Sequence, residues 1–166
     1  MPVRKLSLIL FACLLLPAAA LAERVAAGDG SLVVSDASGK LTLSGRGLIF
    51  GHLDHGTITV SDYKPDDTTV PSISGAKMKL SGGNVVYTGT NVRFLFPGGR
   101  YAITIEGINI DISAVGTGKL VAIGAGFIDD GSFTADGGRS QSIDFAGSVS
   151  YGKGAAVAVA ARGRNG

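Results

Sequence analysis

Both histidines of the chain and one carboxylate lie within four consecutive residues, His52-Leu53-Asp54-His55. Zinc and copper accept imidazole nitrogens and carboxylate oxygens, so His52, Asp54 and His55 are the candidate metal ligands of this sequence. On an extended strand, the side chains of His52 and Asp54 point to the same side. The alternative interpretation is a turn, in which Asp54 bonds to nearby backbone and Gly56 takes the left-handed conformation.

Glu106 and Asp111 are a candidate pair of carboxylates, one on each side of Gly107 to Asn109. A glycosidase needs two carboxyl groups facing one cleft, and a turn at these residues would place Glu106 and Asp111 on neighbouring strands. The alternative is that both lie on the solvated face of a sheet. Ser-His-Asp hydrolysis has no support, because the sequence contains no G-x-S-x-G motif. We predict no catalytic residue, no cofactor and no enzymatic activity.

A seven-residue phrase recurs along the chain: apolar, any, apolar, any, Gly, any, and then Gly or Asn. It begins at Leu41, Met78, Val85, Ile103, Ile112 and Leu120. Alternation places both apolar side chains on one face of a short strand, and Gly or Asn supplies the positive φ of a tight turn. Several starts are eight or nine residues apart. We predict an all-β fold, an antiparallel β-sandwich or barrel of many short strands punctuated by Gly, with a β-solenoid as the alternative.

The two halves of the chain resemble each other. Residues 51–59 (GHLDHGTIT) match residues 126–134 (GFIDDGSFT), which retain the Asp and Gly but replace the histidines with Phe127 and Asp130. This comparison favours turn chemistry over metal binding at His52 and His55. We predict pseudo-repeats over about 30–96 and 100–160, with a polar insertion at 62–74 in the first half.

The beginning of the chain is typical of a secretory signal peptide. Arg4 and Lys5 precede an apolar run, and Ala20-Leu21-Ala22 forms a small-residue cleavage site. The run is shorter than the ~20 residues that a transmembrane helix needs. We predict removal of residues 1–22, a single domain over 23–161 and a flexible tail at 162–166. Lipoprotein processing at Cys13, the only cysteine, is the less favoured alternative.

The composition after residue 22 excludes several function classes. Subtracting Arg4 and Lys5 from 15 basic residues leaves 13, which balance 13 acidic residues, so nucleic acid is not an expected partner. The chain has no Trp, and alternation leaves only Tyr63 and Tyr101 as exposed tyrosine rings for a sugar platform. No later segment is long and apolar enough for a membrane-spanning helix.

These observations favour an exported, non-enzymatic binding or structural module. We expect it in the periplasm or outside the cell, with an envelope or extracellular component as its partner. A metal-binding protein that uses His52, Asp54 and His55 is the first alternative, and a carboxylate-based glycosidase is the second.

The segments GRGLIFGHLDHGTITV and INIDISAVGTGKLVAIG resemble secreted all-β bacterial proteins that have no assigned activity. The resemblance implies export and an all-β fold. Its motifs are those of strands and turns, so it transfers no catalytic residue.

Overall fold

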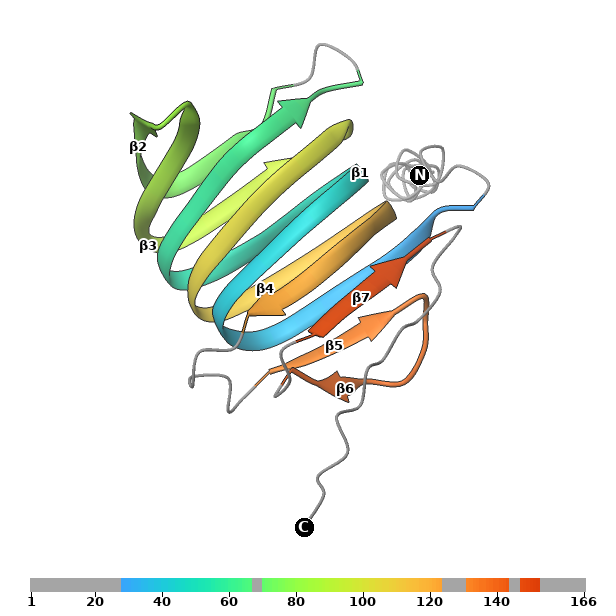
Figure 1. The fold of residues 1–166 in the computed structure, drawn as a ribbon. Helices are drawn as coiled ribbons and strands as arrows, with labels where there is room; N and C mark the ends of the chain where they lie inside the picture. The colour runs from blue at the N-terminus through green and yellow to red at the C-terminus, as the bar shows by residue number, and fades with distance from the viewer. Residues whose placement is uncertain (1–27, 67–69, 124–130, 144–146, 153–166) are drawn as a thin grey trace, which may run out of the picture.

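The computed structural model describes residues 28–66, 70–123, 131–143 and 147–152. The predicted signal peptide, Cys13 and the predicted tail lie outside these residues. The described chain contains no helix and forms seven strands, β1 (Gly30–Lys64), β2 (Ser72–Ser81), β3 (Asn84–Phe96), β4 (Arg100–Ile123), β5 (Ser132–Ala135), β6 (Gln141–Ser142) and β7 (Gly147–Tyr151) (Figure 1).

Every strand pair is antiparallel, which confirms the predicted all-β antiparallel fold and rejects a solenoid of stacked parallel coils. Over the described residues, the sheet follows the order β2-β3-β1-β4-β7, and β5 pairs with β1 and β6. This path has two ends and does not close into a barrel. No helix among the described residues is long and apolar enough to cross a membrane.

Strands β1 and β4 pair with each other twice. Lys40 lies opposite Glu106 on one side and opposite Ile123 on the other, and these two partners are 17 positions apart on β4. Strand β4 therefore travels once around the molecule between the two contacts. Figure 1 shows the result as stacked arcs, in which the two strands wind together around one axis. We call this arrangement the coil.

The coil bends at one side through residues with positive φ, Asp36 (54°), Asn91 (49°), Asn109 (50°) and Gly56 (155°). Gly56 on β1 lies beside Asn91 on β3 and Asn109 on β4, because His55 pairs with both Thr90 and Ile108. Asp36, in the first part of β1, lies on the other side of Asn109, because Ala37 pairs with Ile110. We call these four residues the polar corner. Asp36 also falls at a shift of register between Val34 and Ala37, where β1 carries an extra residue and bends as a β-bulge does.

The opposite bend consists of glycines, which we call the glycine corner: Gly45, Gly47, Gly116 and Gly118. Gly47 pairs with Gly116, and a Cβ at Gly47 would lie only 2.1 Å from the carbonyl oxygen of Val115. Only glycine permits so close an approach of the two backbones. Gly47 and Gly56 are nine residues apart, so the spacing of the sequence phrase corresponds to half a turn of the coil.

In most copies of the phrase, the predicted chain-reversing turn is instead a corner, at which the strand bends and continues. Strands β1 and β4 are therefore far longer than the short strands expected from sequence. The exception is Gly82-Gly83, where both residues have positive φ and join β2 to β3 in a hairpin. A two-residue hairpin loop of this kind requires positive φ at two adjacent positions. Gly-x-Gly lacks that adjacency, so the strand bends and continues.

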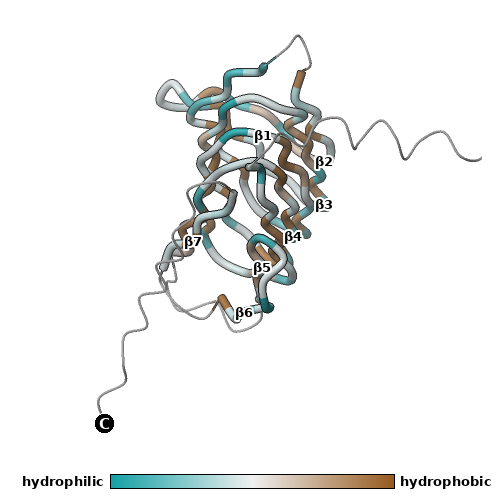
Figure 2. The backbone as a smooth tube through the Cα atoms, turned by 90° about the vertical axis from the view of Figure 1, so that its right-hand side faces the viewer, coloured by the Kyte–Doolittle hydropathy of each residue, from teal (hydrophilic) through white to brown (hydrophobic). Residues whose placement is uncertain are grey.

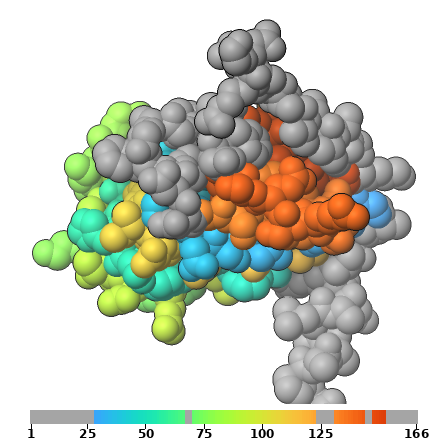
Figure 3. All heavy atoms as spheres, turned by 90° about the horizontal axis from the view of Figure 1, so that it is seen from below, coloured from blue at the N-terminus to red at the C-terminus, as the bar shows by residue number. Residues whose placement is uncertain are grey.

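One core of apolar side chains fills the coil, and no charged residue is buried within the described chain. The largest fully buried side chains come from β1, β3, β4 and β7 and include Leu41, Leu43, Phe96, Tyr101, Ile103 and Tyr151. Strand β5 pairs with the first part of β1 and with β6, and β7 pairs with the last part of β4. The orange, red and blue atoms of these segments lie together in Figure 3. Strand β3 lies outside the later part of β1, and β7 lies outside the later part of β4. The duplication and the domain limits stay predictions.

Candidate functional site

The structure places His52 beside two carboxylates near the polar corner. His52 Nε2 is 3.3 Å from Asp54 Oδ1, and His52 Nδ1 is 4.0 Å from Asp111 Oδ2. His52 and Asp54 share a side of β1 as predicted, and Asp111 arrives because it lies opposite His52 on β4. Residues 52 and 111 are too far apart in sequence for any local pattern to reveal their contact.

The carboxylates at this corner bond to the residues that bend the strands. Asn109 donates its Nδ2 to Asp54 Oδ2 at 2.7 Å, and the backbone N–H of Asp36 donates to Asp111 Oδ1 at 3.0 Å. The donors belong to left-handed residues, whose backbone groups leave the regular ladder. Asp54 and Asp111 therefore stabilise the bend. The turn interpretation expected Asp54 to bond to nearby backbone, whereas in the structure it bonds to Asn109 of the neighbouring strand.

The three candidate metal ligands are not equivalent in the structure. His52 and Asp54 are in contact, whereas His55 is exposed at the bend. Within the described residues, no group of three or more His, Cys, Asp or Glu side chains is arranged to hold a metal ion. The geometry thus gives the metal hypothesis no complete ligand set.

Glu106 and Asp111 lie on one strand, β4, and the prediction that they occupy neighbouring strands is wrong. Gly107 to Asn109 does not reverse the chain, because a single left-handed residue, Asn109, bends the strand there. Asp111 bonds to the backbone of Asp36, whereas Glu106 lies opposite Lys40 and Thr57. The two carboxyl groups consequently stand on different sides of a bend.

Two tyrosines form the polar contact inside the core. The hydroxyls of Tyr101 and Tyr151 hydrogen-bond to each other, and both residues are buried. Burial raises the pKa of Tyr101, and burial together with the neighbouring Tyr101 hydroxyl raises the pKa of Tyr151. The expectation that Tyr101 is exposed is wrong, because it packs inward beside Gly45 and Gly118, where no side chain competes for the space.

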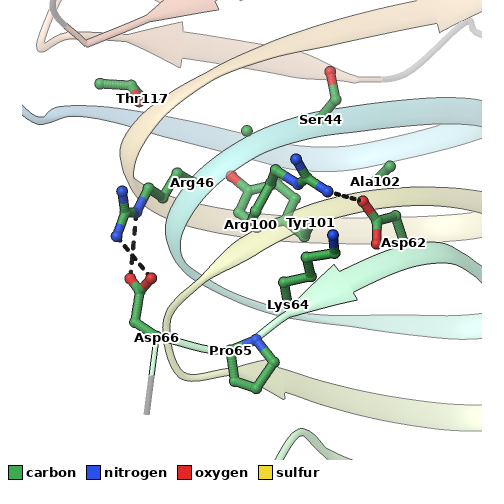
Figure 4. A pocket seen from close by; sticks show the side chains of 11 residues that line it. Ser44, Arg46, Asp62, Lys64, Pro65, Asp66, Arg100, Tyr101, Ala102 and Thr117 are labelled. Atoms are coloured by element: carbon green, nitrogen blue, oxygen red, sulfur yellow. Dashed lines mark hydrogen bonds and ion pairs between the residues drawn. The ribbon is translucent and has the colours of Figure 1, made fainter.

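An open groove of about 800 Å³ lies beside the glycine corner, where β1 ends and β4 begins. Figure 4 shows the five charged side chains that line it, Arg46, Asp62, Lys64, Asp66 and Arg100. We call it the charged groove. Its residues come from separate parts of the sequence, and no motif pointed to them.

The ladder sets three cations of the charged groove in a row. Arg100 lies opposite Arg46 on one side and opposite Lys64 on the other. Like charges directly opposite one another are destabilising, so this row needs compensation. Asp66 accepts from Arg46 Nη2 at 2.8 Å, and Asp62 accepts from Arg100 Nη2 at 2.7 Å. Lys64 is exposed and has no ion-pair partner among the described residues, so the described side chains that line the groove carry one surplus positive charge.

Comparison with family models, with curated proteins and with solved structures finds no match to this chain.

Proposed function

We propose that this protein is an exported, non-enzymatic binding module of the cell envelope or extracellular space, and that the charged groove holds its ligand. The observation that carries the proposal is the row of Arg46, Arg100 and Lys64, of which Lys64 alone pairs with no carboxylate in the part of the chain that the structure describes. A surplus cation in an open polar groove attracts an anionic group. The ligand class is therefore a polar polymer that bears acidic groups, such as an acidic polysaccharide.

The charged groove suits reversible binding. The side chains of Arg46 and Arg100 are 69% and 58% exposed, and each already holds a carboxylate. Ion pairs as exposed as these contribute about 1 kcal/mol or less, so an incoming anion can exchange with Asp62 or Asp66 at little cost. The absence of enzymatic activity is part of the proposal, and the bonds that occupy Asp54 and Asp111 support it.

Titration calorimetry with polygalacturonate and with neutral dextran tests this proposal. We expect the purified protein to bind polygalacturonate in low salt, to lose most of that affinity at 0.5 M salt, and not to bind dextran. Lys64→Gln should weaken binding about fivefold, the equivalent of one exposed ion pair of about 1 kcal/mol. Lys119→Gln, an exposed lysine of β4 outside the groove, is the matched control. Equal binding of both polymers, or an equal effect of the two substitutions, would reject the groove.

The first alternative is a metal-binding protein, and the contact between His52 and Asp54 is the observation in its favour. The metal content of the purified protein distinguishes this alternative from the proposed anion-binding module. Stoichiometric zinc or copper in the purified protein that is lost in His52→Ala/His55→Ala would favour a metal-binding protein. We expect no stoichiometric metal and unchanged polygalacturonate binding in that variant.

A further inference from the structure

The coil ends at β2, whose outer edge pairs with no other strand among the described residues. β2 is the arc at one end of the fold, and β3 is its one partner among the described strands (Figure 1). An exposed edge presents a row of free N–H and C=O groups that can accept another strand. Gly75 interrupts the regular edge, because the register shifts between Ser74 and Ala76. The regular part is thus Ala76 to Ser81, six residues or about 20 Å.

The side of β2 that faces the core is apolar and only partly covered. Ile73 and Ala76 pack against the core, as does Tyr87 on β3. Met78 and Leu80 continue the same side of β2, but they are 63% and 77% exposed. Figure 2 shows apolar segments, in brown, along β2 and β3. A further strand would cover these two side chains as the neighbouring strands cover Leu41 and Leu43.

The opposite side of β2 is basic. Lys77 and Lys79 alternate with Met78 and Leu80, and Arg93 lies on β3. Neither β2 nor β3 contains an acidic residue. A strand that pairs with β2 thus meets apolar side chains on one face and, on the other, lysines that form no ion pair with any described residue.

We propose that the edge from Ala76 to Ser81 binds an extended segment of another protein in which apolar and acidic side chains alternate. Such a segment adds to the sheet through backbone hydrogen bonds, a recognition mode in which the edge supplies affinity and alternate side chains supply specificity. Its apolar residues cover Met78 and Leu80, and its carboxylates pair across the strands with Lys77 and Lys79. This site shares no residue with the charged groove.

The charges argue against a second copy of the chain as the occupant. An antiparallel pair of β2 strands centred on Met78 would set Lys77 of one copy opposite Lys79 of the other, twice. Like charges directly opposite are destabilising, and lysines on an edge strand are a recognised protection against self-pairing. The same lysines attract an acidic partner.

Fluorescence anisotropy with labelled, acetylated seven-residue peptides tests the proposal. We expect a peptide that alternates Glu and Val to bind about tenfold more tightly than one that alternates Lys and Val. The Glu/Val peptide with every backbone nitrogen N-methylated should not bind, because it has no N–H group left to donate to the β2 edge. Lys77→Glu/Lys79→Glu should reverse the preference, whereas Lys40→Glu/Lys119→Glu, with the same change of net charge at exposed sites elsewhere, should leave it unchanged.

Several outcomes would overturn this proposal. One is equal binding of all three peptides; another is binding that Leu80→Ser does not weaken. Self-association in sedimentation that Leu80→Ser weakens would identify a second copy as the occupant. Binding to phosphatidylglycerol vesicles without binding to the Glu/Val peptide would identify a lipid surface. Lys64→Gln should not affect peptide binding, so failure of this site and failure of the charged groove can be told apart.

Discussion

The sequence phrase at residues 41–47 and its copy at residues 78–84 have the same pattern of apolar residues but differ in how much of their apolar side chains is buried. Leu41 and Leu43 are fully buried at 0% exposure, whereas Met78 and Leu80 remain largely open to solvent. Both pairs face the axis of the coil. The first pair lies on a strand with neighbours on both sides, and the second lies on the last strand. Alternation therefore determines which side faces inward, and position in the coil determines how much of that side is buried.

The glycines of the two copies differ as well. Gly82 and Gly83 are adjacent and close a hairpin, and a Cβ at Gly82 would have no atom within 4 Å. Gly45 and Gly47 are separated by Arg46, and Gly47 lies against the backbone of Val115. Glycine is needed only for its conformation at Gly82, whereas Gly47 needs it for the missing side chain as well as for a positive φ of 131°.

The largest expected difference is between matched leucine truncations. Leu43→Ala should lower the free energy of unfolding by about 2–5 kcal/mol, because it leaves a cavity in a packed core. Leu80→Ala should change it by about 0.5 kcal/mol or less, since its side chain is 77% exposed. Urea unfolding of both variants measures the difference. Equal losses would mean that the β2 end is covered in solution.

Matched glycine substitutions should give the next largest difference. Gly47→Ala should cost about 2–4 kcal/mol, because the new Cβ meets a backbone oxygen that cannot move aside alone. Gly82→Ala should cost about 1 kcal/mol, the ordinary penalty of a left-handed alanine, and Gly82→Asn should cost less. Thermal unfolding monitored by circular dichroism gives the comparison. A loss at Gly82 as large as that at Gly47 would contradict the distinction between corner and hairpin.

The buried tyrosine pair, which joins β4 to β7 far from the β2 edge, should give the smallest difference. Tyr151→Phe leaves the Tyr101 hydroxyl without its partner and should cost about 1–3 kcal/mol. The double variant Tyr101→Phe/Tyr151→Phe should cost less than the sum of the single variants. Tyr87→Phe at the β2 end is the control and should have little effect.

The same pair gives a prediction for alkaline pH. Because folding raises the pKa of both hydroxyls above the usual value near 10, the unfolded chain loses these protons first as the pH rises. The stabilising contribution is complete below pH 10 and declines above it. Urea unfolding between pH 9 and 11 should show a steeper decline for the parent protein than for the double phenylalanine variant. If stability declined equally in both proteins, ionisation of the tyrosine pair would not contribute to unfolding at alkaline pH.

Alternation in the sequence predicted much of the core. The apolar pairs at Leu41, Ile103, Ile112 and Leu120 are buried as expected. The winding could not be predicted, because a residue such as Lys40 pairs with two positions of β4 that are distant from it in sequence. Period-two alternation is the same in a flat sheet, a sandwich and a coil.

Local sequence predicted part of the polar corner and none of the charged groove. The contact between His52 and Asp54 follows from their spacing on one strand. The row of Arg46, Arg100 and Lys64 depends on the register of β1 against β4, which is fixed by packing along their whole length. Among the copies of the phrase, the adjacency of Gly82 and Gly83 is the local signal that distinguishes the hairpin from the corners.

The double pairing of β1 with β4 also constrains how the chain reaches its native state. Gly30 pairs with Gly116, and even the nearest partners, Lys64 and Arg100, are separated by the entire β2–β3 hairpin. The hairpin can form in about 1–10 μs, whereas topologies dominated by non-local pairs fold in milliseconds to seconds. Because β1 and β4 have two native registers 17 residues apart, a nascent β1–β4 pair can place one register where the other belongs. Such slipped pairs must separate before the native pairing can form. We therefore expect refolding to show a slow phase whose rate does not depend on how fast the β2–β3 hairpin forms.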